Sequence, residues 1–280
     1  MNLIVQGPAA TAAQAAELAA ISGAERSESL GPHAFRLIRA AQRDDIPAWC
    51  EARRLDCAWI PEGRRFDRLK LLSMDMDSTL ITIECIDELG ASVNRKAEIA
   101  AITGQAMRGE IDYPESLRRR VALLAGLSEE ALQDVYDDKL RLTPGAEALI
   151  DQCRRYGVKL LLVSGGFTFF TERLRARLGF DDTLSNVLEI EGGRLTGNVL
   201  GRIVDANAKA TKFRQMAQRL GTAREQTVAI GDGANDLAMM AEAGTSIAFH
   251  AKPVVRAKAT HALDFSGLDG VLNLFERANP

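Results

Sequence analysis

The sequence predicts an α/β fold with three parts: a core built on a mostly parallel sheet, an all-helical insertion, and a small α+β domain in front. Short apolar runs that end in polar or acidic residues alternate with amphipathic segments, as in a parallel sheet with helices on both faces. A purely helical pattern interrupts this alternation over residues 84–140. We therefore expect the core at 67–83 and 141–280, the helical insertion at 84–140, and the small domain at 1–66.

The first 66 residues show strand and helix patterns in the order β-α-β-β-α-β. This order resembles a small ferredoxin-like or ACT-like regulatory module, on layout alone. The polar segment 61–68 is the expected linker. The expected strands lie at 3–5, 27–30, 34–38 and 57–60, and the expected helices at 9–21 and 46–55.

The core begins with the segment 69–79, in which an apolar run ends in acids and hydroxyls. A buried parallel strand ends in this way, and functional residues are expected at its carboxyl end. Further core strands are expected at 158–164, 227–231 and 246–249, a hairpin around 191–193, and helices at 144–156, 168–178, 206–220 and 236–243. Amphipathic runs in the insertion lie at 93–102, 114–125 and 129–140.

Composition narrows the class of protein. Apolar residues make up 46% and charged residues 26%, the balance of an ordinary globular chain. With 35 Lys and Arg against 38 Asp and Glu the net charge is −3, so we expect no nucleic-acid partner. No apolar stretch has membrane-spanning length and the start lacks a signal pattern, so we expect a cytoplasmic protein without a membrane partner. The four cysteines lack metal-site spacing and are expected to be reduced thiols, and the sequence is compatible with a homodimer without determining the oligomeric state.

Two carboxylates stand two residues apart just after the first core strand. Asp75 can attack phosphorus and form an acyl phosphate, which water then cleaves. Asp77 can protonate the leaving alkoxide and later accept a proton from the incoming water. By itself this pair is weak evidence, because a strand-end turn with capping acids has the same pattern.

Three further segments support the phosphate chemistry. Ser164 and Gly165 close a second strand before a helix, where a hydroxyl and backbone N–H groups can receive an anion. Lys209 can supply a fixed positive charge, and Asp232 closes a third strand with an acid suited to Mg2+. Each has a structural alternative: a helix cap, a solvated lysine, an ordinary turn. The catalytic interpretation is favoured because all of them stand at expected strand ends or helices of one core.

These segments resemble, in order, the four motifs of the haloacid dehalogenase superfamily of phosphotransferases, over residues 69 to 280. The resemblance implies a Rossmann-like core with a helical-bundle cap inserted after the first motif. It implies that Asp75 is the nucleophile, that Asp77 is the acid/base, and that Mg2+ is held by Asp75, the Asp77 carbonyl and Asp232. Asn235 would face the phosphate, and Asp236 would support the metal-binding side chains.

The insertion looks like the cap of phosphoserine phosphatases in segments 84–88 and 106–124. A zwitterionic amino acid needs an anion for its ammonium and a cation for its carboxylate, and Glu84 and Arg120 supply these charges. The resemblance implies Mg2+-dependent hydrolysis of O-phospho-L-serine, the final step of phosphorylated serine biosynthesis.

Structural alternatives apply to the insertion as well. Glu84 can cap a helix, Arg120 can be a solvated arginine, and Met107, a substrate-contact candidate, can be core packing. Tyr113 departs from the phenylalanine of related enzymes, and its hydroxyl requires a partner in an enclosed site.

Two competing functions remain open from the sequence. One is phosphoryl transfer to an acceptor other than water, such as homoserine, through the same intermediate. The other is amino-acid sensing through residues 1–66, with a vestigial phosphatase site.

Overall fold

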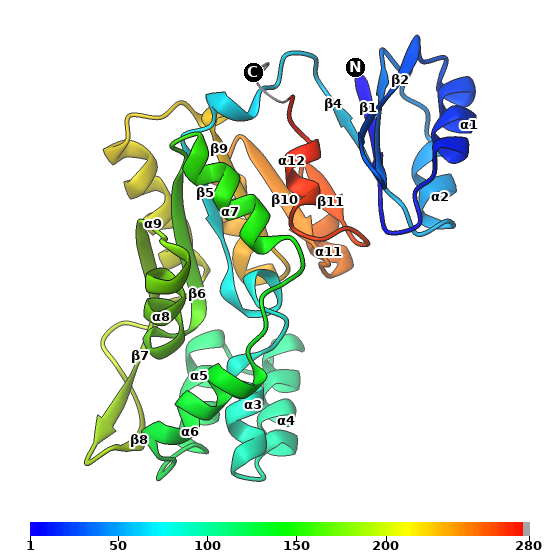
Figure 1. Ribbon diagram of the computed structural model, residues 1–280. Coiled ribbons are helices and arrows are strands. Elements are labelled where there is room, and N and C mark those ends of the chain that lie inside the picture. Colours follow the sequence, from blue (N-terminus) through cyan, green and yellow to red (C-terminus); the bar gives the residue numbers. More distant parts are fainter. Residues whose placement is uncertain (277–280) are drawn as a thin grey trace.

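The N-terminal part of the chain forms a four-stranded antiparallel sheet of order β2-β3-β1-β4, with both of its helices on one face. The computed structural model describes residues 1–276. Figure 1 shows α1 and α2 on the side of the sheet that faces away from the core. The predicted β-α-β-β-α-β order is confirmed. Its elements are β1 (Asn2–Gln6), α1 (Ala12–Ser22), β2 (Arg26–Gly31), β3 (Ala34–Ile38), α2 (Asp45–Glu51) and β4 (Asp56–Ile60).

A seven-stranded sheet of order β11-β10-β9-β5-β6-β7-β8 forms the core, parallel except for the hairpin partner β8. The predicted α/β fold with a mostly parallel sheet is confirmed. Its strands are β5 (Leu71–Met74), β6 (Lys159–Phe167), β7 (Asp182–Glu191), β8 (Arg194–Leu200), β9 (Thr227–Gly231), β10 (Thr245–Phe249) and β11 (His261–Leu263). Its helices are α7 (Ala146–Arg155), α8 (Thr168–Leu178), α9 (Ala206–Arg219), α10 (Leu237–Glu242), α11 (Pro253–Arg256) and α12 (Gly270–Asn273), with short 3-10 turns at Phe66–Arg68, Arg224–Gln226 and Ala234–Asp236.

The position of β5 fixes where a site can form. The chain moves from β5 to β6 and β7 on one side, and later to β9, β10 and β11 on the other. The strand order therefore reverses between β5 and β9, and the crevice at the carboxyl ends of such strands is where ligands bind in open α/β sheets. Alternating side chains of β5 pack on the two faces: Leu71 lies with Phe213 of α9, and Leu72 lies with Leu149 of α7.

The helical insertion sits over the carboxyl ends of the core strands, below them in Figure 1. It comprises α3 (Cys85–Ser92), α4 (Lys96–Met107), α5 (Tyr113–Ala122), α6 (Glu129–Asp134) and a helical turn at Val135–Lys139. Asp112 begins α5 as a side-chain cap, because its carboxylate accepts a hydrogen bond from the Glu115 N–H at 2.8 Å. The β7–β8 hairpin also touches the insertion, since the Gly126 N–H donates to the Leu195 carbonyl at 2.8 Å.

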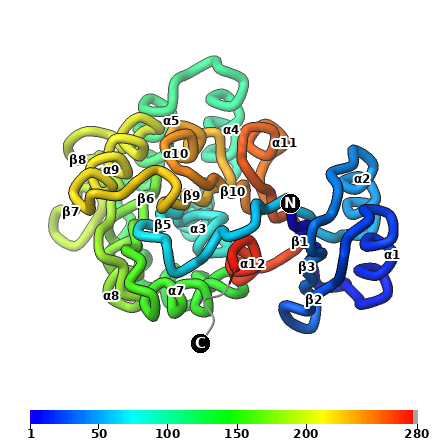
Figure 2. Tube along the Cα trace, turned by 90° about the horizontal axis from the view of Figure 1, so that it is seen from above, coloured from blue at the N-terminus to red at the C-terminus, as the bar shows by residue number. Residues whose placement is uncertain are grey.

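The N-terminal sheet is docked beside the core through polar anchors, and Figure 2 shows it next to α11 and α12. The buried Asp56 carboxylate accepts hydrogen bonds from the backbone N–H groups of residues 264–266 at 2.6 to 3.3 Å. Arg36 donates to the Phe275 carbonyl at 2.7 Å. Ile4, which points away from α1, belongs to the same apolar cluster as the core sheet.

Several boundaries differ from the sequence prediction. The first helix begins at Ala12 rather than residue 9, because Thr11 caps it by accepting a hydrogen bond from the Gln14 N–H. Strand β6 runs through the two glycines to Phe167 instead of ending at residue 164. Three elements of only three or four residues, α11, β11 and α12, were not predicted. Among the described residues, no helix has the length and apolarity needed to cross a bilayer.

Candidate active site

A tight turn after β5 aims two carboxylates at the crevice. The Asp75 carboxylate accepts a hydrogen bond from the Met76 N–H at 2.7 Å, which begins the turn Met76–Leu80. The turn is irregular: Asp77 has extended backbone angles and Ser78 adopts a left-handed φ of 56°. A non-glycine residue is uncommon there, and such conformations gather at functional sites. The turn therefore places Asp75 and Asp77 at the same cavity, while each carboxylate has its own hydrogen-bond and ion-pair partners.

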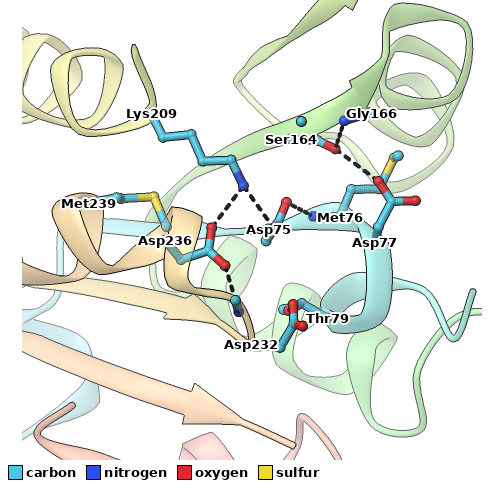
Figure 3. A network of polar contacts seen from close by, with 12 residues as sticks. Asp75, Met76, Asp77, Thr79, Ser164, Gly166, Lys209, Asp232, Asp236 and Met239 are labelled. Atoms are coloured by element: carbon cyan, nitrogen blue, oxygen red, sulfur yellow. Dashed lines mark hydrogen bonds and ion pairs between the residues drawn. The ribbon is translucent and has the colours of Figure 1, made fainter. Parts of the chain in front are cut away.

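Lys209 joins two buried carboxylates. Its ammonium lies 2.8 Å from Asp75 and 2.8 Å from Asp236, and Figure 3 shows it pointing between them. Burial disfavours the charged lysine, but the carboxylates of Asp236 and Asp75 outweigh that effect and raise the pKa of Lys209 above its ordinary value. Asp236 is further fixed because it accepts a hydrogen bond from the Gly233 N–H at 3.1 Å. The lysine is buried between two carboxylates, so the alternative of a solvated side chain is wrong.

Three carboxylates at the end of β5 and after β9 form an acidic cluster. Oxygen atoms of Asp75, Asp232 and Asp236 lie within 4.8 Å of one another. Thr79 donates a hydrogen bond to Asp232 at 3.1 Å. Burial, followed by the nearby Asp236 carboxylate, raises the pKa of Asp232 to about 6 and that of Asp75 well above its ordinary value.

The charge balance of this cluster fits a divalent cation. Three carboxylates with one lysine leave two negative charges uncompensated when all are ionised. Asp236 already uses its oxygens on Lys209 and the Gly233 N–H, so Asp75 and Asp232 are the better ligands. Hard cations such as Mg2+ prefer one or two carboxylates with phosphate and water. The cluster therefore offers carboxylate ligands suited to a hard divalent cation.

Asp77 is held in place by hydrogen bonds from both sides. One of its oxygens accepts from the Cys85 N–H at 2.8 Å, and the other accepts from the Ser164 hydroxyl at 3.1 Å. Burial raises the pKa of Asp77, although the two hydrogen bonds oppose this. Ser164 in turn accepts from the Gly166 N–H at 2.8 Å and does not cap α8, whose N-cap is Phe167. A carboxyl with a raised pKa in a fixed position suits proton transfer.

A cavity of about 800 Å3 opens above these groups, between the core and the insertion. Asp75, Asp77 and Asp232 line its floor, and the insertion supplies apolar and charged residues around them. The predicted residues Glu84, Met107, Arg120, Gly165 and Asn235 all line it. Ser164, Lys209 and Asp236 lie beneath it, fully buried.

Glu84 and Arg120 both face this cavity. Glu84 occupies the N-cap position of α3 but makes no capping bond there; it accepts a hydrogen bond from Ser78 at 2.7 Å. Although the residue as a whole is exposed, its carboxylate lies in the cavity, where loss of water and the nearby Asp77 carboxylate raise its pKa. Arg120 is half-buried while Arg118 and Arg119 are exposed, so it is distinct from its neighbours.

Met107 is 67% exposed, so core packing does not describe it. It lies at the end of α4 and lines the rim of the cavity. An exposed methionine beside a cavity is free to adapt its side chain to a bound molecule.

Three residues of the site were not assigned a role from the sequence. Thr79 holds Asp232, and Asn186 of β7 donates to the Gly165 carbonyl at 2.8 Å. Tyr113 donates to the same carbonyl at 3.1 Å, which supplies the partner that its hydroxyl required. Asn186 lies in a strand with no motif around it, and only its burial in the fold reveals its position.

Comparison with known proteins gives two family matches. Residues 72–241 match the haloacid dehalogenase-like hydrolase family, and residues 3–46 match a domain of unknown function. The first match covers more than half of the chain.

Relatives and solved structures extend the comparison. A phosphoserine phosphatase of Polaromonas sp. is 54% identical over 210 residues, which span 73% of this chain and 89% of the relative. The crystal structure of a probable phosphoserine phosphatase from Vibrio cholerae, in unliganded form, has a TM-score of 0.86 at 38% identity, covering 98% of this chain and 85% of that one. A substrate-bound phosphoserine phosphatase complex has a TM-score of 0.70 at 36% identity, covering 74% and 99%.

Proposed function

The chain belongs to the haloacid dehalogenase-like hydrolase family, and we propose that it hydrolyses O-phospho-L-serine to L-serine and inorganic phosphate. The observation that carries this proposal is the cavity in which Glu84 and Arg120 stand above Asp75 and Asp77. The similarity to proteins named phosphoserine phosphatase, at 54% identity in one case, supports the same substrate.

Asp75 is the proposed nucleophile. Its carboxylate oxygen forms a bond to phosphorus while the bond from phosphorus to the seryl oxygen breaks, which leaves an aspartyl phosphate. Asp77, in its protonated form, gives its proton to the seryl oxygen as that bond breaks. Water then attacks the phosphorus of the intermediate, Asp77 takes its proton, and Asp75 is released with inorganic phosphate.

The positive and polar groups of the floor position the phosphate. Lys209 favours the ionised form of Asp75, against the burial that raises the pKa of this carboxyl, and holds it in place through a contact of 2.8 Å. The Gly165 backbone and the Asn235 side chain, which line the cavity, are the proposed phosphate contacts. Ser164, predicted from the sequence as a further contact, lies beneath them with its hydroxyl donated to Asp77, so we propose that it holds the acid/base in place. Asp236 holds Lys209 and supports the floor without facing substrate.

Mg2+ is the proposed cofactor. Asp75, the backbone carbonyl of Asp77 and Asp232 are the residues that would hold it. When bound, the ion neutralises the phosphate and carboxylate charges that otherwise repel each other. The excess negative charge of the acidic cluster supports this assignment, and it adds to the burial that raises the pKa values of Asp75 and Asp232.

The substrate is identified by its two extra charges. Glu84 would bind the ammonium of phosphoserine, and Arg120 would bind its carboxylate as a fork. Met107 would close the rim against the amino-acid part. We further propose the domain boundaries 1–66, 67–83 with 141–280, and 84–140, a cytoplasmic location, and a role as the final step of serine biosynthesis.

A phosphate-release screen tests this function. The purified chain is incubated with Mg2+ and with phosphoserine, phosphothreonine, phosphotyrosine or a sugar phosphate. We expect kcat/KM for phosphoserine to exceed the others by at least an order of magnitude. A preference for another ester would overturn the substrate, and phosphate transfer to added homoserine instead of water would overturn the hydrolysis.

A further inference from the structure

The carbonyl oxygen of Gly165 accepts two hydrogen bonds from different parts of the fold. Asn186 of β7 donates from its side-chain amide at 2.8 Å, and Tyr113 of α5 donates from its hydroxyl at 3.1 Å. Asn186 is buried and is itself held, because its side-chain oxygen accepts from the Val204 N–H at 2.8 Å. One donor is thus fixed within the core, whereas the other comes from the helical insertion.

The N–H of the same peptide group is linked by hydrogen bonds to Asp77, the proposed acid/base. The N–H of Gly166, in the peptide plane of the Gly165 carbonyl, donates to the Ser164 hydroxyl at 2.8 Å. The Ser164 hydroxyl then donates to Asp77 at 3.1 Å. Because a peptide group is planar, rotating the Gly165 carbonyl also rotates the N–H that holds Ser164. A continuous chain of hydrogen bonds therefore runs from Tyr113 to the Asp77 carboxylate.

Close packing restricts the movement of the residues in this series of hydrogen bonds. A Cβ atom at position 165 would clash with the Tyr113 hydroxyl, so the two residues fill one space. A Cβ atom at position 166 would lie 2.6 Å from an Asp77 oxygen. Both positions need glycine because a neighbour approaches the backbone. Burial raises the pKa of Tyr113 to about 12, so its hydroxyl keeps the proton it donates.

We propose that Tyr113 is a positioning residue that couples the placement of the helical insertion over the core to the alignment of Asp77. When α5 lies over the site, the Tyr113 hydroxyl completes the hydrogen bonds to the Gly165 carbonyl and holds the Ser164 hydroxyl on Asp77. When α5 moves away, only Asn186 holds that carbonyl. This proposal deepens the proposed function and rests on the role of Asp77 in it.

Tyr113→Phe tests the proposal, because it removes the hydroxyl and keeps the ring. A net hydrogen bond corresponds to a change of about 2- to 10-fold, and Asn186 retains part of the constraint. We expect kcat to fall by that factor for phosphoserine and equally for p-nitrophenyl phosphate, with little change in KM. A loss confined to phosphoserine, or a change in KM alone, would instead make Tyr113 a substrate contact and overturn the proposal.

Tyr136→Phe is the matched control. Tyr136 lies in the same insertion, is half-buried, and does not line the cavity. We expect this variant to keep the original kcat for both substrates. An equal fall of kcat in both variants would show general softening of the insertion and would also overturn the proposal.

Amide hydrogen exchange supplies a readout independent of turnover. In Tyr113→Phe the segment 164–167 should exchange faster, while in Tyr136→Phe it should not. Unchanged exchange in Tyr113→Phe would overturn the coupling even if activity fell. Because this measurement needs no substrate, it separates failure of the coupling from failure of the phosphoserine assignment.

Discussion

The Lys209 ammonium contacts the Asp75 carboxylate at 2.8 Å, and both side chains are buried. A buried charge pair of this kind holds its members in one geometry, because either alone would be costly. Lys209 compensates only part of the surrounding negative charge, since Asp232 and Asp236 lie beside Asp75. Asp75 is therefore aimed by the protein, while the remaining charge favours a bound cation.

Asp75→Asn should abolish turnover while leaving the fold intact. The amide is nearly isosteric but cannot attack phosphorus, so we expect kcat to fall by at least roughly a thousandfold. Steady-state phosphate release measures this, and circular dichroism with thermal unfolding checks the fold. Substantial activity in a folded variant would contradict the role of Asp75.

Stabilisation by Mg2+ should increase as pH rises from 5 to 7. The raised pKa of Asp232, about 6, means that this carboxyl is protonated at pH 5 in the metal-free protein. In the metal-free protein, ionising Asp232 destabilises the folded state, and this loss of stability develops as pH rises from the ordinary pKa of an aspartate towards 6. Bound Mg2+ stabilises the ionised carboxylate and so removes this loss. Below pH 6 the ion must displace a proton, so its apparent affinity should weaken by about tenfold per pH unit.

Thermal unfolding with Mg2+ and with EDTA at each pH measures this effect. The difference in Tm between the two conditions isolates the site from other titrating groups. We expect it to grow to about pH 7 and then level off. Asp232→Asn should lose most of this difference, and a difference that is independent of pH, or that persists in this variant, would argue against the site.

Sequence patterns predicted β5, β9 and β10 because each has its own apolar run. The end of β6 was placed three residues too early, at 164, and β7 was predicted only through the hairpin around 191–193. The predicted floor and cavity residues all lie in or beneath one cavity, since parallel strands bring their carboxyl ends to one edge. The short strand β11 gives no periodic signal in three residues. Its place is set by pairing with β10, which is a tertiary contact.

The hydrogen-bond partners within the site could not be predicted. Ser78 adopts a left-handed backbone in the turn after β5, a conformation that serine does not favour and that the local sequence therefore does not predict. Asn186 stands in a strand without a motif, and its role depends on the position of the Gly165 carbonyl. Such roles follow from contacts between residues distant in sequence.

Asp56→Ala should destabilise the docked N-terminal sheet. Its buried carboxylate accepts hydrogen bonds from three backbone N–H groups, which would be left unpaired. We expect the free energy of unfolding to fall by about 3 kcal/mol. The chain has 2 tryptophans, Trp49 and Trp59, both in this part, so fluorescence during urea unfolding reports on it. Asp44→Ala, which removes an exposed carboxylate without a capping bond, should leave the midpoint unchanged.

Arg120→Ala should reduce turnover of phosphoserine selectively. Arg120 lines the cavity from α5, and its Nε donates to the Ser116 carbonyl at 3.3 Å, so its terminal nitrogens are not used in that hydrogen bond. Charge-assisted hydrogen bonds contribute roughly 1.5 to 3 kcal/mol, so kcat/KM for phosphoserine should fall by about one to two orders of magnitude.

A generic ester separates recognition by Arg120 from damage to the site. p-Nitrophenyl phosphate has no carboxylate or ammonium, so its slower hydrolysis should change little in Arg120→Ala. Disturbance of the insertion or of Asp77 would depress both reactions together, because both use the same nucleophile and acid/base. Arg118→Ala, which removes an exposed arginine two residues before Arg120 in α5, should preserve both activities. Equal losses on the two substrates, or no loss on phosphoserine, would remove the basis for naming this substrate and leave the hydrolase assignment in place.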